Sequence, residues 1–130
     1  MKILMKKFKP TNTNNLIATY AERFVSLKRD LNAVGYFCKG TVLKRMMQCG
    51  QKRCACQHDP SKRHGPYFEW TFKAKGKTIS VHLQPEEARV YQKAAGEYRK
   101  LKSLLTRMER LSRIALPRLA RKALSDSEKI

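Results

Sequence analysis

The segment CGQKRCACQHDPSKRHGPY, from Cys49 to Tyr67, restricts the fold of this chain more than any other part of it. It places three cysteines and two histidines within sixteen residues and separates them with basic side chains. Thiolate and imidazole are ligands that Zn²⁺ prefers, and four of them at short spacing can close a tetrahedral site. Because the segment has few apolar side chains to bury, we expect a bound metal to order it.

The expected zinc ligands are Cys49, Cys54, Cys56 and His64, which form the pattern C-x4-C-x-C-x7-H, with His58 as an alternative for the fourth position. Two other interpretations remain, in which the cysteines are buried structural thiols or redox-active nucleophiles. The polar neighbours of the cysteines argue against an apolar core around them. Four protein ligands leave no open coordination position, so the expected role of the zinc is structural.

The charge of the chain predicts a polyanionic partner. Lys and Arg number 29 against 10 acidic residues, which gives a formal net charge of +19. An excess of this size favours negatively charged partners, and nucleic acid is the most common of these for a small basic protein. A solvated surface is the simpler explanation, but such surfaces usually mix both signs. No apolar run approaches the roughly 20 residues of a membrane-spanning helix.

The length of 130 residues suits one domain with a modest core. The N-terminal sequence MKILMKKFK lacks the apolar region of a secretory signal peptide, so we expect a cytoplasmic protein with reduced thiols. Residues 1–13 are expected to form a flexible basic arm, residues 14–124 a single α+β zinc-binding domain, and residues 125–130 a frayed tail.

Two segments carry apolar residues at helical spacing. The first stripe consists of Ile17, Tyr20, Phe24, Leu27, Leu31 and Val34, and the second of Tyr91, Ala94, Tyr98, Leu101, Leu105 and Met108, broadened by Leu104 and Leu111. Pro85 suits the first position of the second helix, and Pro117 is expected to stop or kink it, with one more helical piece over residues 118–124. We expect the two stripes to pack on each other. In the alternative, one stripe forms a coiled-coil dimer.

The middle of the chain favours β-structure. Residues 41–47 are rich in strand formers, and residues 67–72 and 78–83 alternate in polarity. Residues 73–77 contain a glycine and predict the turn of a hairpin, with Phe68, Trp70 and Phe72 on one strand face. The expected fold class is therefore α+β, with an N-terminal helix, a small antiparallel β-sheet carrying a zinc-binding loop, and a long basic C-terminal helix.

The run from Gly40 to Lys77 resembles a family of small prokaryotic proteins of unknown function that carry a CG…CxC…HGPY signature. The matching residues are Cys49-Gly50, Cys54-Ala55-Cys56 and His64-Gly65-Pro66-Tyr67, followed by an aromatic strand and a Gly-Lys turn. The similarity extends over roughly residues 35–110. It implies that the ligand set includes His64 rather than His58, and its similarity to genes near transposable elements implies a mobile-element accessory protein.

Basic residues concentrate in two regions. Residues 39–77 hold ten basic and two acidic residues, and residues 98–122 hold nine basic and one acidic residue. Contacts from these side chains to phosphates would dominate affinity. We expect duplex DNA as the partner, with structured RNA as an alternative, because exposed aromatic residues for stacking on single strands are not evident. The expected nucleic-acid-binding residues are Lys44, Arg45, Lys52, Arg53, Lys62, Arg63, Lys73, Lys75, Lys77, Arg99, Lys100, Arg107, Arg110 and Arg113.

These features predict a zinc-stabilised DNA-binding accessory or regulatory factor rather than an enzyme. The alternative is a protein-interaction subunit that docks on a recombinase or nuclease through its helical stripes, or a homodimer formed in the same way. A small nuclease would need acidic metal ligands or a His–carboxylate pair in a cleft, and the ten acidic residues are scattered along the chain.

Overall fold

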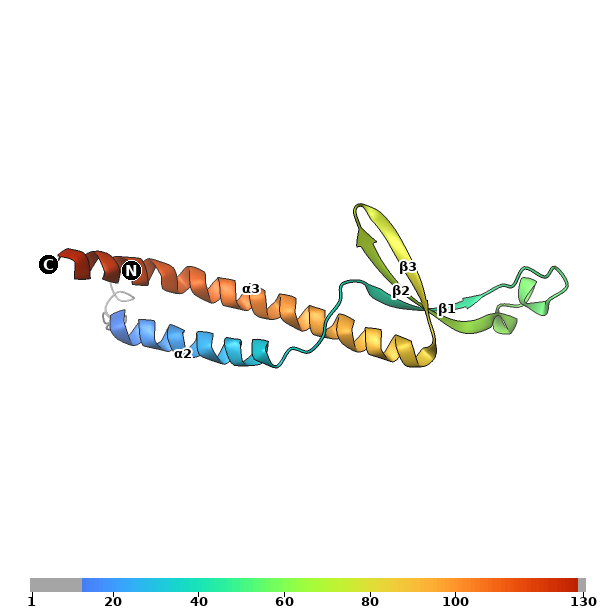
Figure 1. Cartoon of the computed structure of the whole chain (residues 1–130), viewed down its shortest axis with the longest axis horizontal. Coiled ribbons are helices and arrows are strands. Elements are labelled where there is room, and N and C mark those ends of the chain that lie inside the picture. Colours follow the sequence, from blue (N-terminus) through green and yellow to red (C-terminus); the bar gives the residue numbers. More distant parts are fainter. Residues whose placement is uncertain (1–12, 129–130) are drawn as a thin grey trace, which may run out of the picture. The chain divides into compact units, whose positions relative to one another are not determined.

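The computed structural model describes residues 13–128 (Figure 1). The expected basic arm of residues 1–13 lies outside the described residues except for Thr13, and so do the last two residues of the expected tail. The described chain has the expected α+β composition of an N-terminal helix, a three-stranded antiparallel sheet and a long C-terminal helix. The elements are α2 (Thr13–Asn32), β1 (Thr41–Met47), the 3₁₀ turns η1 (Ala55–Gln57) and η2 (Pro60–Lys62), β2 (His64–Ala74), β3 (Lys77–Leu83) and α3 (Pro85–Glu128).

The chain divides into two compact units. Among the described residues, one unit combines α2 and the two residues after it, up to Val34, with the part of α3 from Leu101 onward. The other unit is Gly35–Lys100, which contains the sheet, the cysteine-rich loop and the first part of α3.

The core of the helical unit joins the two apolar stripes. Leu27 of α2 is buried together with Leu104 and Leu111 of α3. Partly buried side chains surround this cluster, namely Tyr20, Phe24, Leu31, Val34 and Met108. The expected pairing of the stripes is therefore confirmed in part, because the second stripe contributes Leu104, Met108 and Leu111, whereas Leu105 is 52% exposed.

Helix α3 begins as expected but does not end as expected. Pro85 occupies its first position, and the Glu87 carboxylate accepts a hydrogen bond from the backbone N–H of Gln84 (2.9 Å), which caps the first turn. The expected stop at Pro117 is wrong, because the helix continues to Glu128. A proline removes one backbone hydrogen bond. Leu116 and Leu119, on either side of Pro117, line a groove with α2, although both side chains stay exposed.

The sheet has the strand order β1-β2-β3, with antiparallel neighbours. Strands β2 and β3 are joined through Lys75 and Gly76, whose φ angles of 52° and 77° are those of a type I′ hairpin turn. The predicted hairpin is confirmed, with β2 longer than expected at its start. The Trp70 ring stacks on Phe72 (ring centroids 4.2 Å apart) and lies 4.8 Å from Tyr91 of α3. The aromatic face of the sheet therefore packs on the first part of α3.

The connection between α2 and β1 is tied to both α3 and the sheet. The Gly35 N–H donates to the Glu97 carboxylate (2.9 Å), and the Cys38 N–H donates to the Ala94 carbonyl (3.2 Å). The indole N–H of Trp70 donates to the Lys39 carbonyl (2.8 Å). These bonds hold the start of β1 against the first part of α3, and so fix the strand from which the cysteine-rich loop departs.

Candidate metal centre

Four side chains of the cysteine-rich loop converge on one point. The ligand atoms of Cys49, Cys54, Cys56 and His64 all lie within 4.8 Å of one another. Cys56 is only 1% exposed, the other two cysteines are partly buried, and His64 is exposed. The cluster therefore lies at the surface with one thiol beneath it, and it could hold a metal ion.

The spacing of the donor atoms suits tetrahedral coordination. The Cys49 and Cys56 sulfurs are 3.5 Å apart, and the Cys54 sulfur is 3.2 Å from His64 Nε2. A tetrahedron with Zn–S bonds near 2.3 Å has sulfur–sulfur edges of about 3.8 Å, so these separations need little adjustment to receive an ion. The cysteines are free thiols rather than disulfides. Three sulfurs and one imidazole nitrogen also form a common structural zinc ligand set.

The strand ladder closes the loop beneath this cluster. Cys49 follows the end of β1, and His64 is the first residue of β2. Between them, Cys54 directly precedes η1 and Cys56 lies within it. Met47 pairs with His64 across the two strands, which brings both ends of the loop together. The pairing of β1 with β2 thus fixes both ends of the loop, and the four side chains converge within it.

Backbone and side-chain donors orient the cysteine sulfurs. The Cys49 N–H donates to Cys56 Sγ (3.3 Å). The Gln57 amide donates to the Cys49 carbonyl and lies 3.8 Å from Cys56 Sγ. Such outer contacts fix the orientation of metal ligands. The sequence interpretation missed Gln57, whose only signal was its position directly after Cys56.

Gly65, next to the ligand His64, occupies a position that excludes a side chain. Its φ of +133° is rarely adopted by other residues, and a β-carbon there would lie 2.7 Å from the carbonyl oxygen of Arg45. The register of β1 and β2 shifts at this point, between Arg45 and Met47. Gly50, next to the ligand Cys49, differs from Gly65, because it has no positive φ and a β-carbon there would meet nothing within 4 Å.

The remaining cysteine and histidines lie outside the cluster among the described residues. His58 and His82 are both exposed. Cys38 is partly buried, and burial raises the pKa of its thiol. The fourth position of the cluster is therefore occupied by His64 rather than by His58.

Asp59 stabilises the far side of the loop. Its carboxylate accepts hydrogen bonds from the Ser61 N–H (3.0 Å) and the Ser61 hydroxyl (2.7 Å), capping η2. The same two bonds, with the hydroxyl contributing most, lower the pKa of Asp59. This acidic side chain thus has a local structural role in the turn before His64.

All the basic residues expected to bind nucleic acid are exposed. Most lie in the sheet unit: on β1, in the loop and η2, and around the turn from β2 to β3. Arg107, Arg110 and Arg113 belong to the helical unit instead. The two sets are therefore carried by different units of the chain.

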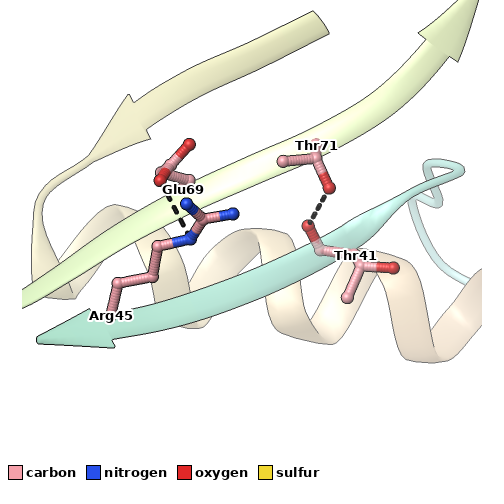
Figure 2. A network of polar contacts seen from close by, with 4 residues as sticks. All are labelled: Thr41, Arg45, Glu69 and Thr71. Carbon is pink, nitrogen blue, oxygen red and sulfur yellow. Dashed lines mark hydrogen bonds and ion pairs between the residues drawn. The ribbon is translucent and has the colours of Figure 1, made fainter. Parts of the chain in front are cut away.

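Three of these residues make ion pairs that the sequence interpretation did not anticipate. Lys100 pairs with Glu97 (3.0 Å) and Arg113 with Glu109 (3.1 Å) along α3. Arg45 of β1 pairs through Nε with a carboxylate oxygen of Glu69 on β2 at 3.3 Å (Figure 2). Glu69 is only 8% exposed, and the neighbouring strand β1 places Arg45 against it.

Within residues 13–128, the structure has no helix that is both long and apolar enough to cross a membrane. The long α3 carries charged residues throughout its length.

A protein-family model described as a domain of unknown function (DUF6788) matches residues 17–92. The match begins within α2 and includes the sheet and the whole cysteine-rich loop. It thus starts earlier than the region of resemblance traced from about residue 35. The chain has no significant match among curated proteins or solved structures.

Proposed function

The chain belongs to the DUF6788 family, whose function is unknown, and from the site itself we propose that it is a zinc-stabilised nucleic-acid-binding protein. The expected target is duplex DNA, with structured RNA as the alternative. The observation that carries this proposal is the convergence of four metal-binding side chains in a loop that also presents exposed basic residues. These are Lys52, Arg53, Lys62 and Arg63.

The donor set favours zinc over other metals. Thiolate sulfur selects soft or borderline ions, and a site with three sulfurs and one imidazole nitrogen is tetrahedral. Magnesium and calcium prefer oxygen ligands, which this cluster does not offer. When bound, zinc would fix the loop rather than supply a reactive water, because four protein ligands fill its coordination sphere. This closed arrangement supports a binding protein rather than an enzyme.

The charge of the loop supports a polyanionic ligand even after the metal is counted. Zn²⁺ with three thiolates and a neutral histidine carries a net charge of −1, so the ion itself does not attract phosphate. Four basic side chains and the single acidic Asp59 lie between the first and last ligands. The loop therefore stays cationic with metal bound, and a rigid loop reduces the entropy lost when basic side chains meet phosphates.

A metal and DNA titration tests the proposal. Purified protein should contain about one zinc per chain, and it should retard duplex DNA with an affinity that falls steeply as salt rises. The slope of log affinity against log salt concentration is negative, and each phosphate contact contributes about 0.9 to its magnitude. The double variant Lys52→Ala/Arg53→Ala should therefore reduce that magnitude by up to about 1.8. The matched control Arg23→Ala/Arg29→Ala removes the same charge from α2 and should leave the slope near that of the wild type.

The role of an accessory or regulatory factor of a mobile element is the part of the proposal that depends on sequence resemblance. The CG…CxC…HGPY pattern at Cys49 to Tyr67 supports it, since the resembling proteins are similar to those encoded near transposable elements. Mobility of an element tested with and without this protein in the same cell would measure that role, and equal frequencies would contradict it.

A second candidate function is supported by an apolar groove in the helical unit. Helices α2 and α3 form a groove of about 350 Å³ whose lining includes Phe24, Val25 and Leu116. Lys28 also lines it, and the Arg118 guanidinium lies 5.9 Å from the ring centre of Tyr20, another lining residue. An acidic amphipathic helix of a recombinase or nuclease would complement both the apolar lining and these cations. A size measurement of the purified protein at high salt and a DNA-binding assay separate the two functions. A protein that is monomeric at high salt and does not bind DNA would favour this docking role over direct binding.

A further inference from the structure

We propose that the polar face of the sheet contacts the bases of duplex DNA and that Arg45, held in place by Glu69, recognises guanine. This inference rests on the proposed nucleic-acid-binding function and assigns the base-reading residue within it. It concerns only the unit Gly35–Lys100, where both side chains and the sheet lie.

The strand register defines this polar face. Residues paired across neighbouring strands share a face, so Thr41 lies with Thr71, Arg45 with Tyr67, and Glu69 with His82. The opposite face carries Trp70, which packs against Tyr91 of α3. Figure 2 shows α3 behind the sheet while Arg45 and Glu69 project from its other side. Except for Glu69, Leu43 and Thr71, the described residues of the polar face are exposed.

Glu69 gives this face an unusual feature for a surface sheet. It lies on the middle strand and is buried, yet it carries a carboxylate. A buried charge costs free energy unless a partner offsets it. That partner is Arg45, whose Nε lies 3.3 Å from a Glu69 oxygen, and about half of the Arg45 side chain stays exposed. The pair therefore anchors one end of an exposed guanidinium to the sheet.

An anchored guanidinium is suited to reading a base. Arginine recognises guanine through two parallel hydrogen bonds to O6 and N7, which requires a defined orientation of its planar fork. Contact through Nε holds the side chain at its stem and directs the two Nη nitrogens away from the backbone. Because the arginine is already oriented, binding loses less side-chain entropy.

The distribution of charge along the strands argues for base contact at Arg45 and phosphate contact on either side of it. Lys73, Lys75 and Lys77 surround the turn at one end of β2, and Lys62 and Arg63 precede its other end. Between these ends the polar face carries hydroxyl groups, such as Thr71, whose hydroxyl lies 3.5 Å from the Thr41 carbonyl (Figure 2). Cations at both ends of the polar face can contact phosphates, while the Arg45–Glu69 pair lies between them.

Selection of binding sites from a random duplex library, followed by affinity measurements, tests this assignment. Wild type should enrich guanine at one position and lose roughly 5- to 150-fold in affinity when that base is changed, as expected for one bidentate pair. Arg45→Lys keeps the charge and should lose this preference while its affinity for random DNA changes less than about threefold. Lys73→Arg, on the same face without a carboxylate anchor, is the matched control and should keep the preference.

Glu69→Gln separates a positioning role from simple electrostatics. Removing a negative charge should raise affinity for random DNA, because the protein becomes more positive. If Glu69 positions Arg45, the ratio of guanine-site to random affinity should nevertheless fall. The fluorescence of Trp70, the single tryptophan, reports on the opposite face and confirms that both variants fold.

The outcomes are distinguishable. Failure of the wild type to retard any duplex overturns the proposed function itself, and the base-reading role with it. Binding without base preference, or an unchanged preference in both folded variants, overturns the assignment of Arg45 and Glu69 while nucleic-acid binding stands.

Discussion

The Nε2 atom of His64 lies 3.2 Å from the sulfur of Cys54, although η1, η2 and the Asp59 turn separate the two residues along the chain. The imidazole reaches this position because His64 is the first residue of β2 and pairs with Met47. The pairing of β1 with β2 thereby places the His64 imidazole next to the thiols of Cys54 and Cys56, which the turn η1 holds close to each other.

Removal of this imidazole should weaken metal binding. His64→Ala leaves three sulfurs, and we expect a loss in zinc affinity of more than about 100-fold, since even outer-contact changes cost 10- to 100-fold. Competition with a chromophoric chelator measures the change. His58→Ala is the control, because this exposed histidine lies outside the cluster. Equal losses in the two variants would contradict the assignment of His64.

Removal of the metal should loosen the loop without unfolding the helices. The core of Leu27, Leu104 and Leu111 includes no residue of the cluster. We therefore expect a chelator to leave the helical circular dichroism nearly unchanged while the amides of Cys49 and Gln57 lose protection from hydrogen exchange. Cooperative loss of the whole helical signal would show instead that the metal site and the helical core are one folding unit.

Gly65→Ala should destabilise the protein, whereas Gly50→Ala should not. At Gly65 the backbone conformation alone costs about 1–3 kcal/mol for another residue, and the clash with the Arg45 carbonyl adds to this. At Gly50 a β-carbon meets nothing within 4 Å, so the change should fall within about 0.5 kcal/mol. Urea unfolding of both variants compares them, and similar midpoints would argue against the strand register shift seen here.

Neighbouring leucines of α3 should differ in their contribution to stability. Leu104 is 6% exposed within the helical core, and Leu105 is 52% exposed. Leu104→Ala should cost about 2–5 kcal/mol in the free energy of unfolding. Leu105→Ala should cost far less, about 0.5 kcal/mol or below, because its side chain is largely in solvent. A reversed order would mean that the other side of α3 faces a partner in solution.

Glu97 should make stability depend on pH in the acid range. The N–H of Gly35 and then Lys100 hold the pKa of its carboxyl below the ordinary value. Its contribution is therefore complete above the unfolded pKa of about 4.3 and is lost as pH falls through the lower folded pKa.

Glu97→Gln keeps an oxygen that can accept from Gly35 but removes the charge. The variant should be less stable than the wild type near neutral pH, and the two should converge as the pH falls below the unfolded pKa and through the lower folded pKa of Glu97. Thermal melts across this range measure the difference. A gap between the two proteins that stays constant down to pH 2.5 would contradict the role of the charge.

The sequence was sufficient to predict the elements and the four clustered side chains because both depend on local patterns. The spacing of Leu27 and its neighbours predicts a helix face, and the cysteines are concentrated in one loop. For the fourth position the spacing left His58 open as an alternative to His64, and the resemblance then favoured His64. Strand pairing decides between them, as it places His64 opposite Met47.

Contacts that depend on register could not be predicted. Whether Glu69 meets Arg45 is decided by how β1 aligns with β2, and this alignment is regular from Thr41 to Arg45. The alternation of residues 67–72 puts Glu69 on the face opposite Phe68, Trp70 and Phe72, but it does not show that Glu69 is buried there. Likewise, the local rule for proline predicts a stop or a kink at Pro117, whereas the helix continues through it to Glu128.

The strand order has a consequence for how copies of this protein behave together. Strands β1 and β3 each have one edge without a partner strand in the part of the chain that the structure describes. Such edges invite pairing between molecules and subsequent aggregation. Lys44 and Arg45 lie on one edge strand and Lys77 begins the other, so two molecules meeting edge to edge would bring cations together. This repulsion discourages growth into a continuous intermolecular sheet, even at high protein concentration.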